Sequence, residues 1–395
     1  VLTTNGSGTV SWAAAGGGTA LELYDENPSS ATANTVTGTN AVAIGSNATA
    51  SGSNSFAGGV NTTASAIGSF VYGRNSTASG ADSLAFGSIA VASGSTSISI
   101  GTNTDATQNG SVAIGSGAQA TSAYSFAAGK NSSGAASVAT SGNAATALGG
   151  SYASGNDSFA AAIANNTSTY GATGTSSVAM GKQNKATATI STAVGGQNCV
   201  ASHNYAFASG NGSTASGYAS TSIGHSNTAS EFYTVSTGGF ALANLWGKQA
   251  HASGAFGTVG DAQTGTFVLR SDTTDATPEA LTANNNTAST DNQVILPNNS
   301  VYGFTGTIIA RENSASTNDF AVWEVKGGAV RAATASTTAL GSYNINKISE
   351  STGAATWAIA ISADTTNGGV AFTVTGEASH SIRWVATINT TEVTY

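Results

Sequence analysis

The sequence predicts an all-β protein in which a self-associating parallel β-roll, a β-solenoid of 14-residue coils, precedes a C-terminal β-sandwich or jelly-roll knob. A five-residue signature, small-apolar-small-x-Gly, recurs once in each coil with a constant spacing. After about residue 260 this period gives way to short stretches that alternate between apolar and polar residues, as strands do. The chain has only 3 Pro, so strand ladders are rarely interrupted.

The period is regular over the first part of the repeat. Each coil is expected to hold a strand, a Gly or Asn turn, a second short strand and another turn. Seven signatures follow one another without a break, at residues 41–45, 55–59, 69–73, 83–87, 97–101, 111–115 and 125–129.

Alternation within a strand sends neighbouring side chains to opposite faces. A 14-residue coil encloses a thin interior, so the small residues are expected inside and the large residue at the second signature position outside. We call these second-position side chains the outer row: Phe56, Phe70, Leu84, Ile98, Val112 and Phe126. An exposed apolar row along every coil needs a partner surface, which predicts association between copies of the chain with this row at the interface.

The period loosens after residue 129, where signatures are expected at 137–141, 158–162, 177–181 and onward to 253–257. The predicted domains are an attachment segment and cap (1–40), the shaft (41–260), a linker (261–296) and the knob (297–395). Candidate strands near and within the knob are 266–270, 293–296, 304–311, 320–325, 355–362, 370–375 and 381–389.

Composition excludes several classes of protein. The net charge is −8 and only 8% of residues are charged, without a basic patch, so no nucleic acid partner is expected. A single cysteine, Cys199, excludes an intrachain disulfide. No run of 18 apolar residues is present.

The sequence Ser-Val-Ala-Ile-Gly at residues 111–115 resembles the head repeats of trimeric autotransporter adhesins. This resemblance covers roughly residues 41–260 and implies a left-handed parallel β-roll with three chains side by side. It therefore implies a homotrimer, with the outer row at the trimer interface. The ends depart from that family, because no heptad coiled coil is evident. Segments 2–12, 297–311 and 323–328 are instead similar to parts of bacteriophage tail fibres.

Catalytic chemistry is not indicated by the sequence, and we expect the protein not to be an enzyme. Glycan hydrolysis needs two carboxylates on one groove, whereas the acids of the shaft, such as Asp82, Asp105 and Asp157, are far apart. Cys199 and His203 do not match a zinc spacing, so neither a metal nor a cofactor is expected. One alternative stays open, in which a single His near a threefold axis meets its two copies.

Receptor contacts are expected on loops of the knob, because loops held by a rigid sheet commonly carry binding residues. The candidate receptor-binding residues are Asp364, Asn367, Glu377 and His380.

These observations predict a homotrimeric phage tail fibre, located in the virion and acting outside the cell. It would contact other tail or baseplate proteins through its N-terminus and recognise a bacterial surface glycan or outer-membrane protein. The alternatives are a bacterial trimeric autotransporter-type adhesin head and a glycan-depolymerising tailspike.

Overall fold

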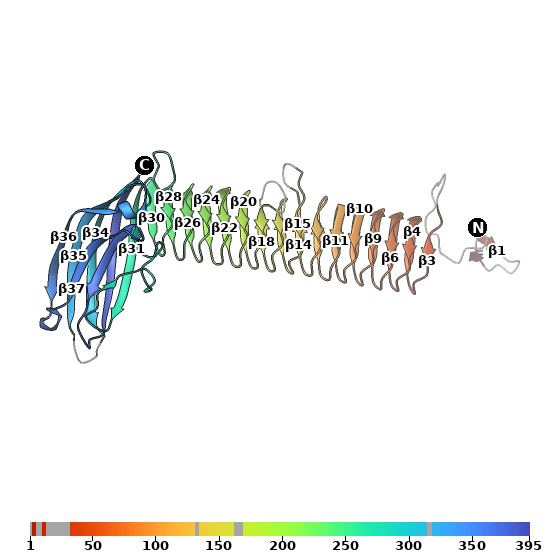
Figure 1. The fold of residues 1–395 in the computed structure, drawn as a ribbon. Coiled ribbons are helices and arrows are strands. Elements are labelled where there is room, and N and C mark those ends of the chain that lie inside the picture. The colour runs from red at the N-terminus through yellow and green to blue at the C-terminus, as the bar shows by residue number, and fades with distance from the viewer. Residues whose placement is uncertain (1, 5–9, 13–31, 131–133, 162–168, 314–317) are drawn as a thin grey trace. The chain divides into compact units, whose positions relative to one another are not determined.

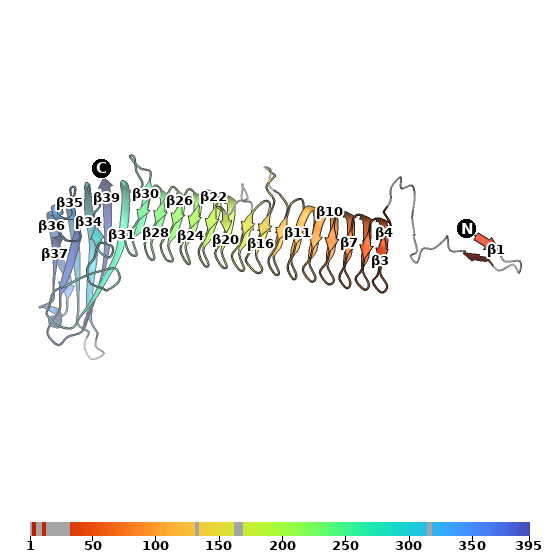
Figure 2. The same ribbon diagram turned by 45° about the vertical axis from the view of Figure 1, so that its right-hand side comes forward.

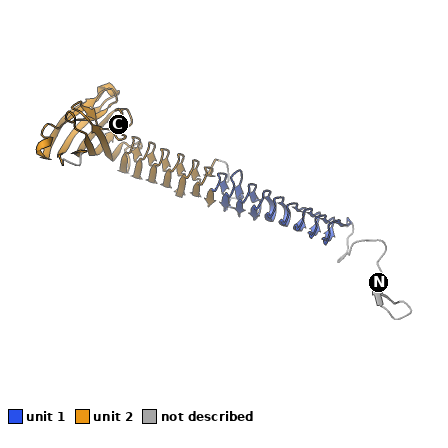
Figure 3. Ribbon diagram, turned by 90° about the horizontal axis from the view of Figure 1, so that it is seen from below, with its two compact units in different colours: residues 1–157 blue, residues 158–395 orange. Residues whose placement is uncertain are grey.

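The structure, a computed structural model, describes residues 2–4, 10–12, 32–130, 134–161, 169–313 and 318–395. The chain divides into two compact units, residues 1–157 and 158–395 (Figure 3). The helical elements among these residues are two short 3-10 helices, η1 (Ala335–Thr337) and η2 (Thr352–Ala354). The prediction of an all-β protein with a β-solenoid is confirmed.

In the first unit, each coil contains a longer strand and a shorter strand, and the coils stack by parallel pairing (Figures 1 and 2). Paired residues occupy the same position in successive coils, as in Phe56↔Phe70 and Thr49↔Thr63. The longer strands are β4 (Val42–Ser46), β6 (Phe56–Val60), β8 (Phe70–Arg74), β10 (Leu84–Ala92), β11 (Ile98–Ala106), β12 (Val112–Ile114), β14 (Phe126–Ala128) and β16 (Thr146–Leu148). The shorter strands are β3 (Thr35–Val36), β5 (Thr49–Ala50), β7 (Thr63–Ala64), β9 (Thr77–Ala78), β13 (Gln119–Ala120), β15 (Val138–Ala139) and β17 (Tyr152–Ala153).

The interior of these coils is built from small side chains, as predicted. Ala57 and Ala85 on the longer strands and Ala50 and Ala64 on the shorter strands are all 0% exposed. Val71 takes the same inward position as Ala57 and is also fully buried. The two strands of a coil therefore approach closely enough for methyl groups to fill the space between them.

Left-handed residues recur every seven positions, twice in each coil. Asn47, Asn54 and Asn61 have φ values of 56°, 58° and 52°, which asparagine tolerates better than other non-glycine residues. The signature glycines have a second constraint, because a Cβ on Gly59 would lie 2.0 Å from the carbonyl oxygen of Gly73 in the next coil. Stacking of coils at this distance requires glycine there.

Two boundaries in this unit differ from the prediction. Residues 32–40 were assigned to a cap, but β3 pairs with β5 in the same register as the coils that follow, so the stack begins before residue 41. The signature expected at 137–141 lies on a shorter strand, β15, which pairs with β13 and β17. The longer strand of that coil is β16, whose Thr146 pairs with Phe126.

The N-terminal segment is described only in part. The strands β1 (Leu2–Thr4) and β2 (Val10–Trp12) pair antiparallel, with Leu2 opposite Trp12. Residues 13–31, which belong to the predicted attachment segment and cap, lie outside the described residues.

The second unit begins with coils of the same construction. The longer strands are β18 (Phe159–Ala161), β20 (Val178–Lys182), β22 (Thr192–Gln197), β24 (Phe207–Asn211), β26 (Thr221–His225), β28 (Val235–Gly239) and β30 (Gln249–Ser253). The shorter strands are β19 (Gly171–Ala172), β21 (Lys185–Ala186), β23 (Val200–Ala201), β25 (Thr214–Ala215), β27 (Thr228–Ala229) and β29 (Leu242–Ala243).

The unit ends in two antiparallel sheets. The first sheet has the strand order β31-β39-β34-β35-β36, and in the second β38 pairs with β32, β33 and β37. Their bounds are β31 (Ala262–Thr273), β34 (Ser300–Glu312), β35 (Phe320–Arg331), β36 (Ala339–Glu350) and β39 (Ile382–Thr394), then β32 (Glu279–Ala280), β33 (Val294–Ile295), β37 (Ala358–Asp364) and β38 (Gly369–Thr375).

One buried cluster contains residues from both sheets, including Trp323 and Trp384 from the first and Phe372 from the second. The predicted linker, residues 261–296, is not a separate segment. Its strand β31 pairs with β39 over 12 residues and contributes Phe267 and Leu269 to the same core. The C-terminal domain therefore begins near residue 261. No helix among the described residues is long and apolar enough to span a membrane.

Candidate functional site

The outer row lies on the outward face of the longer strands, as the alternation predicted. Ala57, one residue after Phe56, is fully buried, whereas Phe56 is partly exposed and Phe70 is 38% exposed. The rings of Phe56 and Phe70 stack at 4.7 Å between centroids. The outer row is thus ordered within the chain and still offers apolar surface, while its role as a trimer interface stays a prediction.

A second row on the same face was not singled out from the sequence. It occupies the fourth signature position, where Tyr72 is 50%, Phe86 is 48% and Ile114 is 39% exposed. Tyr72 and Phe86 stack at 5.6 Å. The signal was present in the alternation, since positions two and four of a strand point the same way. The outward face therefore carries two apolar rows.

In the second unit, this outward face continues onto the first C-terminal sheet. β30 pairs with β31 so that His251 lies opposite Thr264 and Gln249 opposite Thr266, and these side chains share one face. We call the continuation on strands β31, β39, β34, β35 and β36 the outer sheet face. Its exposed apolar residues include six that are each 43–53% exposed: Val268, Val301, Ile309, Val330, Val385 and Val393.

These apolar residues lie in rows across the strands. Val301 is opposite both Val330 and Val393, and Ile309 is opposite Val385. Between the rows lies a groove of about 780 Å³, lined by polar residues such as Thr305, Asn389 and Lys326 and by the aromatic residues Phe304 and Tyr343. An adjoining cavity of about 460 Å³ includes Glu324. Because Glu324 and Lys326 lie two positions apart on one face, this surface carries both charges needed to pair with a copy of itself.

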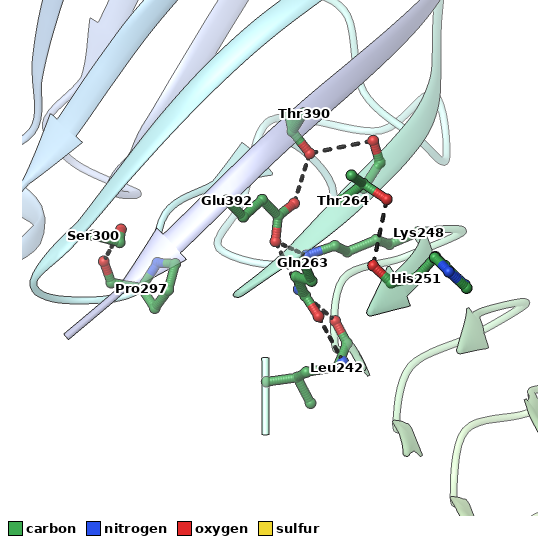
Figure 4. Close-up of polar contacts among 10 residues, drawn as sticks. Leu242, Lys248, His251, Gln263, Thr264, Pro297, Ser300, Thr390 and Glu392 are labelled. Atoms are coloured by element: carbon green, nitrogen blue, oxygen red, sulfur yellow. Dashed lines mark hydrogen bonds and ion pairs between the residues drawn. The ribbon is translucent and has the colours of Figure 1, made fainter. Parts of the chain in front are cut away.

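A buried polar cluster joins the last coil to the first C-terminal sheet (Figure 4). The ammonium of Lys248 lies 2.7 Å from Oε2 of Glu392, and both side chains are almost fully buried. Gln263 donates to the same carboxylate at 2.6 Å and accepts the backbone N–H of Leu242 at 2.7 Å. Thr390 donates to the other carboxylate oxygen at 2.6 Å. This cluster fixes the sheet on the coil that precedes it.

Burial in this cluster lowers the pKa of Lys248, while the charge and hydrogen bond of Glu392 act in the opposite direction. Burial also raises the pKa of the Tyr302 hydroxyl well above its usual value, and the neighbouring Glu392 carboxylate adds to the increase. Removal of either charge would leave its partner buried without compensation. The cluster therefore stabilises the contact between the last coil and the sheet, and its two charged side chains are too deeply buried to reach a ligand.

The four predicted receptor-binding residues do not form one site. Asp364 accepts backbone N–H bonds from Thr366 and Asn367 at 3.0 and 2.9 Å, which closes the turn between β37 and β38. Glu377 and His380 follow the far end of β38. Glu377 accepts a hydrogen bond from Thr356, and Nδ1 of His380 lies 2.9 Å from Glu312. Their role in receptor binding stays a prediction for two separate loops.

An aromatic cluster on the turns of the last coils was also missed from the sequence. These turns join a shorter strand to the next longer strand. We call the cluster the aromatic ladder: His203, Tyr205, Tyr218, Phe232, Tyr233 and Trp246. Tyr218, Phe232 and Trp246 are spaced by the coil period of 14 residues, which is visible in the sequence. They were missed because they lie outside the five-residue signature from which the coils were predicted.

Cys199 is buried in a coil, where its thiol lies 3.2 Å from the carbonyl oxygen of Gly210, and burial raises its pKa. Within the described part of the chain, no group of three His, Cys, Asp or Glu residues could hold a metal ion.

Four segments, residues 37–62, 78–104, 106–132 and 172–198, match the family model of the YadA head domain repeat. The coils of this chain therefore include YadA-like head repeats, in agreement with the resemblance noted from the signature. No curated protein matches the chain.

Two solved structures align with most of the chain. One is a tailspike protein, gp49, of Acinetobacter baumannii bacteriophage Fri1, described as a capsular polysaccharide depolymerase. It has 9% identity and a TM-score of 0.24, and the alignment covers 91% of this chain and 70% of that chain. The other is the tailspike protein of Acinetobacter phage vB_ApiP_P1, with 10% identity, a TM-score of 0.24, and coverage of 92% and 80%.

The prediction that the protein is not an enzyme is corrected by these comparisons, because the aligned structures include a depolymerase. At a TM-score of 0.24 the alignment identifies no catalytic residue and assigns no reaction to this chain.

Proposed function

We propose that the protein is a homotrimeric fibre of a phage virion that attaches to a receptor on the bacterial surface. The observation that carries this proposal is the pair of outward apolar rows on YadA-like repeats, which gives the coils an unpaired adhesive face. The similarity of segments 2–12, 297–311 and 323–328 to phage tail fibres favours a virion component. The N-terminal segment would then attach the fibre to other tail or baseplate proteins.

Trimer formation would bury the outer row. Complete burial of a side chain such as Phe70 or Ile98 contributes about 1.5–3 kcal/mol, and a partly exposed one contributes part of that. In the second unit, the outer sheet face offers a further apolar surface, and its Glu324 and Lys326 suit contact between copies. Each unit is therefore proposed to associate through its own outward face, which leaves the loops and turn edges for the receptor.

Oligomeric state and adhesion test the proposal together. Light scattering on the purified chain should give the mass of a trimer at micromolar concentration, whereas a monomer would refute the assembly. Fluorescently labelled trimer should then bind to cells of some strains in a panel of bacteria. Failure to bind any strain would contradict the receptor-binding function.

The alternatives give different results in the same experiments. A polysaccharide extracted from a bound strain and incubated with the trimer would show shortened chains if the protein is a depolymerising tailspike. Detection of the protein in purified phage particles supports the virion assignment. Its detection on the surface of a bacterium free of phage would indicate the adhesin instead.

A further inference from the structure

We propose that the aromatic ladder and the cavity at its C-terminal end form one binding surface for an uncharged glycan. This inference rests on the proposed receptor-binding function and names where the receptor binds and what its chemistry is. The ladder lies on the turns between β23 and β30, and the cavity is lined in part by Thr366 and Asn367 from the loop that joins β37 to β38.

The ladder is ordered by its own ring contacts. Phe232 stacks on Trp246 at 4.5 Å with planes 7° apart, and on Tyr218 at 5.7 Å. Tyr205 and Tyr233 meet the Tyr218 ring edge to face at 5.3 and 5.9 Å. Ordering of the rings before a ligand arrives lowers the entropy lost on binding.

The coil fold does not demand these aromatic residues. Most equivalent turn positions in the first unit hold small or polar residues such as Ser53, Asn54, Ala81 and Thr96, and the exceptions, Ile67 and Tyr124, lie in coils far apart in the sequence and form no line of rings. Yet in the ladder Tyr205, Phe232 and Tyr233 are 49%, 37% and 54% exposed. Exposed aromatic side chains that the fold does not require are characteristic of binding surfaces.

A cavity of about 300 Å³ lies next to the ladder. It is lined by Asn244 and Leu245, which precede Trp246, and by Thr290, Thr366 and Asn367 among others. Hydroxyl and amide groups of this kind can both donate to and accept from sugar hydroxyl or acetamido groups. Asn367 was predicted from the sequence as a receptor-binding residue, and the cavity gives it neighbours with suitable chemistry.

Arg331 also lines this cavity and has an unused donor. Its Nη1 donates to the carbonyl oxygens of Leu296 and Gly368 at 2.6 and 3.3 Å. Its buried Nε has no acceptor among the described residues. A buried donor without an acceptor costs free energy, so Arg331 is a polar side chain at the cavity whose hydrogen bonds are not all satisfied within the chain.

The balance of charge disfavours an acidic ligand, because two carboxylates, those of Glu231 and Asp291, lie near the ladder, whereas the cavity has one guanidinium, that of Arg331, whose Nη1 is already bonded to two carbonyl oxygens. Glu231 precedes Phe232, and its pKa is raised by partial burial and by the nearby negative charge of Asp291. The backbone carbonyl of Asp291 accepts the N–H of Trp246 at 2.8 Å, which holds this second acid at the end of the ladder. Two carboxylates close together repel a uronic acid or a sialic acid, whereas their oxygens can accept bonds from neutral sugar hydroxyls.

The test uses the full-length trimer and cells of a strain that it binds. Tyr233→Asn removes an exposed ring, and its fold should be preserved because Asn54 occupies the same turn position with a similar φ, 58° against 60°. Trp246→Ser removes the ring beside the cavity. The matched control is Tyr124→Asn, since Tyr124 has the same turn position and a φ of 58° but lies in the first unit and is 71% exposed.

Binding of labelled trimer to cells should weaken about tenfold or more for Tyr233→Asn and Trp246→Ser and stay within about twofold for Tyr124→Asn. Polysaccharide extracted from the strain, separated into neutral and acidic fractions, should compete through the neutral fraction. Competition by the acidic fraction alone would overturn the choice of ligand.

The other possible results distinguish a failure of this inference from a failure of the proposed function. If both variants bind cells as tightly as the unaltered trimer, the inference is wrong and the proposed function stands. If Tyr233→Asn is folded but monomeric in light scattering, the ladder is an interface between copies, which also overturns the inference. If the unaltered trimer binds no strain, the proposed function fails, and the inference fails with it.

Discussion

Replacement of Ile89 by asparagine is expected to stabilise the coils of the first unit. Ile89 has a φ of 57°, in the left-handed region that β-branched residues strongly avoid. The equivalent turn positions in earlier coils hold Asn47, Asn61 and Asn75, with φ values of 56°, 52° and 52°. The coil therefore prefers asparagine where this chain has isoleucine.

Two stabilising contributions and one destabilising contribution determine the expected change in the free energy of unfolding. Removal of the isoleucine from a left-handed backbone conformation stabilises the folded state by about 1–2 kcal/mol. Asn47 donates to Asn61 at 2.9 Å, and Asn61 to Asn75 at 3.0 Å. An asparagine at 89 would extend this amide ladder, with each exposed bond worth about 0.5 kcal/mol. Ile89 is 45% exposed, so its loss removes about 1 kcal/mol of apolar burial. The net gain is about 1 kcal/mol per chain.

Thermal unfolding followed by circular dichroism measures this gain, with variants that separate its two sources. Ile89→Val keeps the β-branch and should not raise the unfolding temperature. Ile190→Asn relieves a similar strain, φ 56°, at a position where the preceding coil has Ser176. Because Ser176 offers no side-chain amide to an asparagine at 190, Ile190→Asn should stabilise the protein less than Ile89→Asn does.

The reasoning is refuted if Ile89→Asn unfolds at or below the temperature of the unaltered protein while keeping its secondary structure. Such a result would mean that apolar contacts of Ile89, including contacts with another copy, outweigh the strain of its backbone.

Three further predictions concern assembly, the buried cluster and acid stability. Ile98→Asp should place three carboxylates near the trimer interface and lower the mass in light scattering at micromolar concentration, whereas Ile98→Val should remain trimeric. Glu392→Gln should destabilise the C-terminal domain by about 3–5 kcal/mol in denaturant unfolding, because Lys248 stays buried without its counter-ion; the double variant Lys248→Met, Glu392→Leu should lose clearly less. Asp261 accepts N–H bonds from Thr258, Phe256 and Gly257, which lower its pKa below the ordinary 3.8. The stabilisation of the folded state by ionised Asp261 is therefore complete above pH 3.8, and it is lost as the pH falls through the lower pKa of the folded state. Asp261→Asn should flatten this acid dependence of the unfolding midpoint, and an unchanged profile would show that Asp261 is not its source.

The coil period could be predicted because geometry leaves few choices at several positions of each coil. Gly59 approaches the next coil too closely for a Cβ, and Ala57 fills an interior with little room for larger groups. The prediction that 137–141 is a signature on a longer strand was wrong because the size pattern alone does not distinguish longer from shorter strands. Ser-Val-Ala at 137–139 and Ala-Thr-Ala at 145–147 have the same size pattern, and only pairing decides which is the longer strand.

The C-terminal sheets were harder to predict because their long strands depend on distant partners. β31 extends over 12 residues since β39, at the far end of the chain, pairs with its whole length. Strand β36 was missed altogether, because most of its residues are exposed and show no alternation. An edge strand of this kind is defined by its partner, here β35, more than by its own sequence.

The turns explain why the proposed binding surface was missed although its spacing was regular. Parallel stacking in a constant register places equivalent residues of successive coils about 4.8 Å apart in space, so any repeated side chain becomes a ladder. In one place the ladder is made of amides, as in Asn47, Asn61 and Asn75, and serves stability. Where Tyr218, Phe232 and Trp246 occupy the other turn, the same geometry gives a line of rings. Interior positions constrained by packing identify the fold, whereas the less constrained turn positions are where a solenoid can acquire a function.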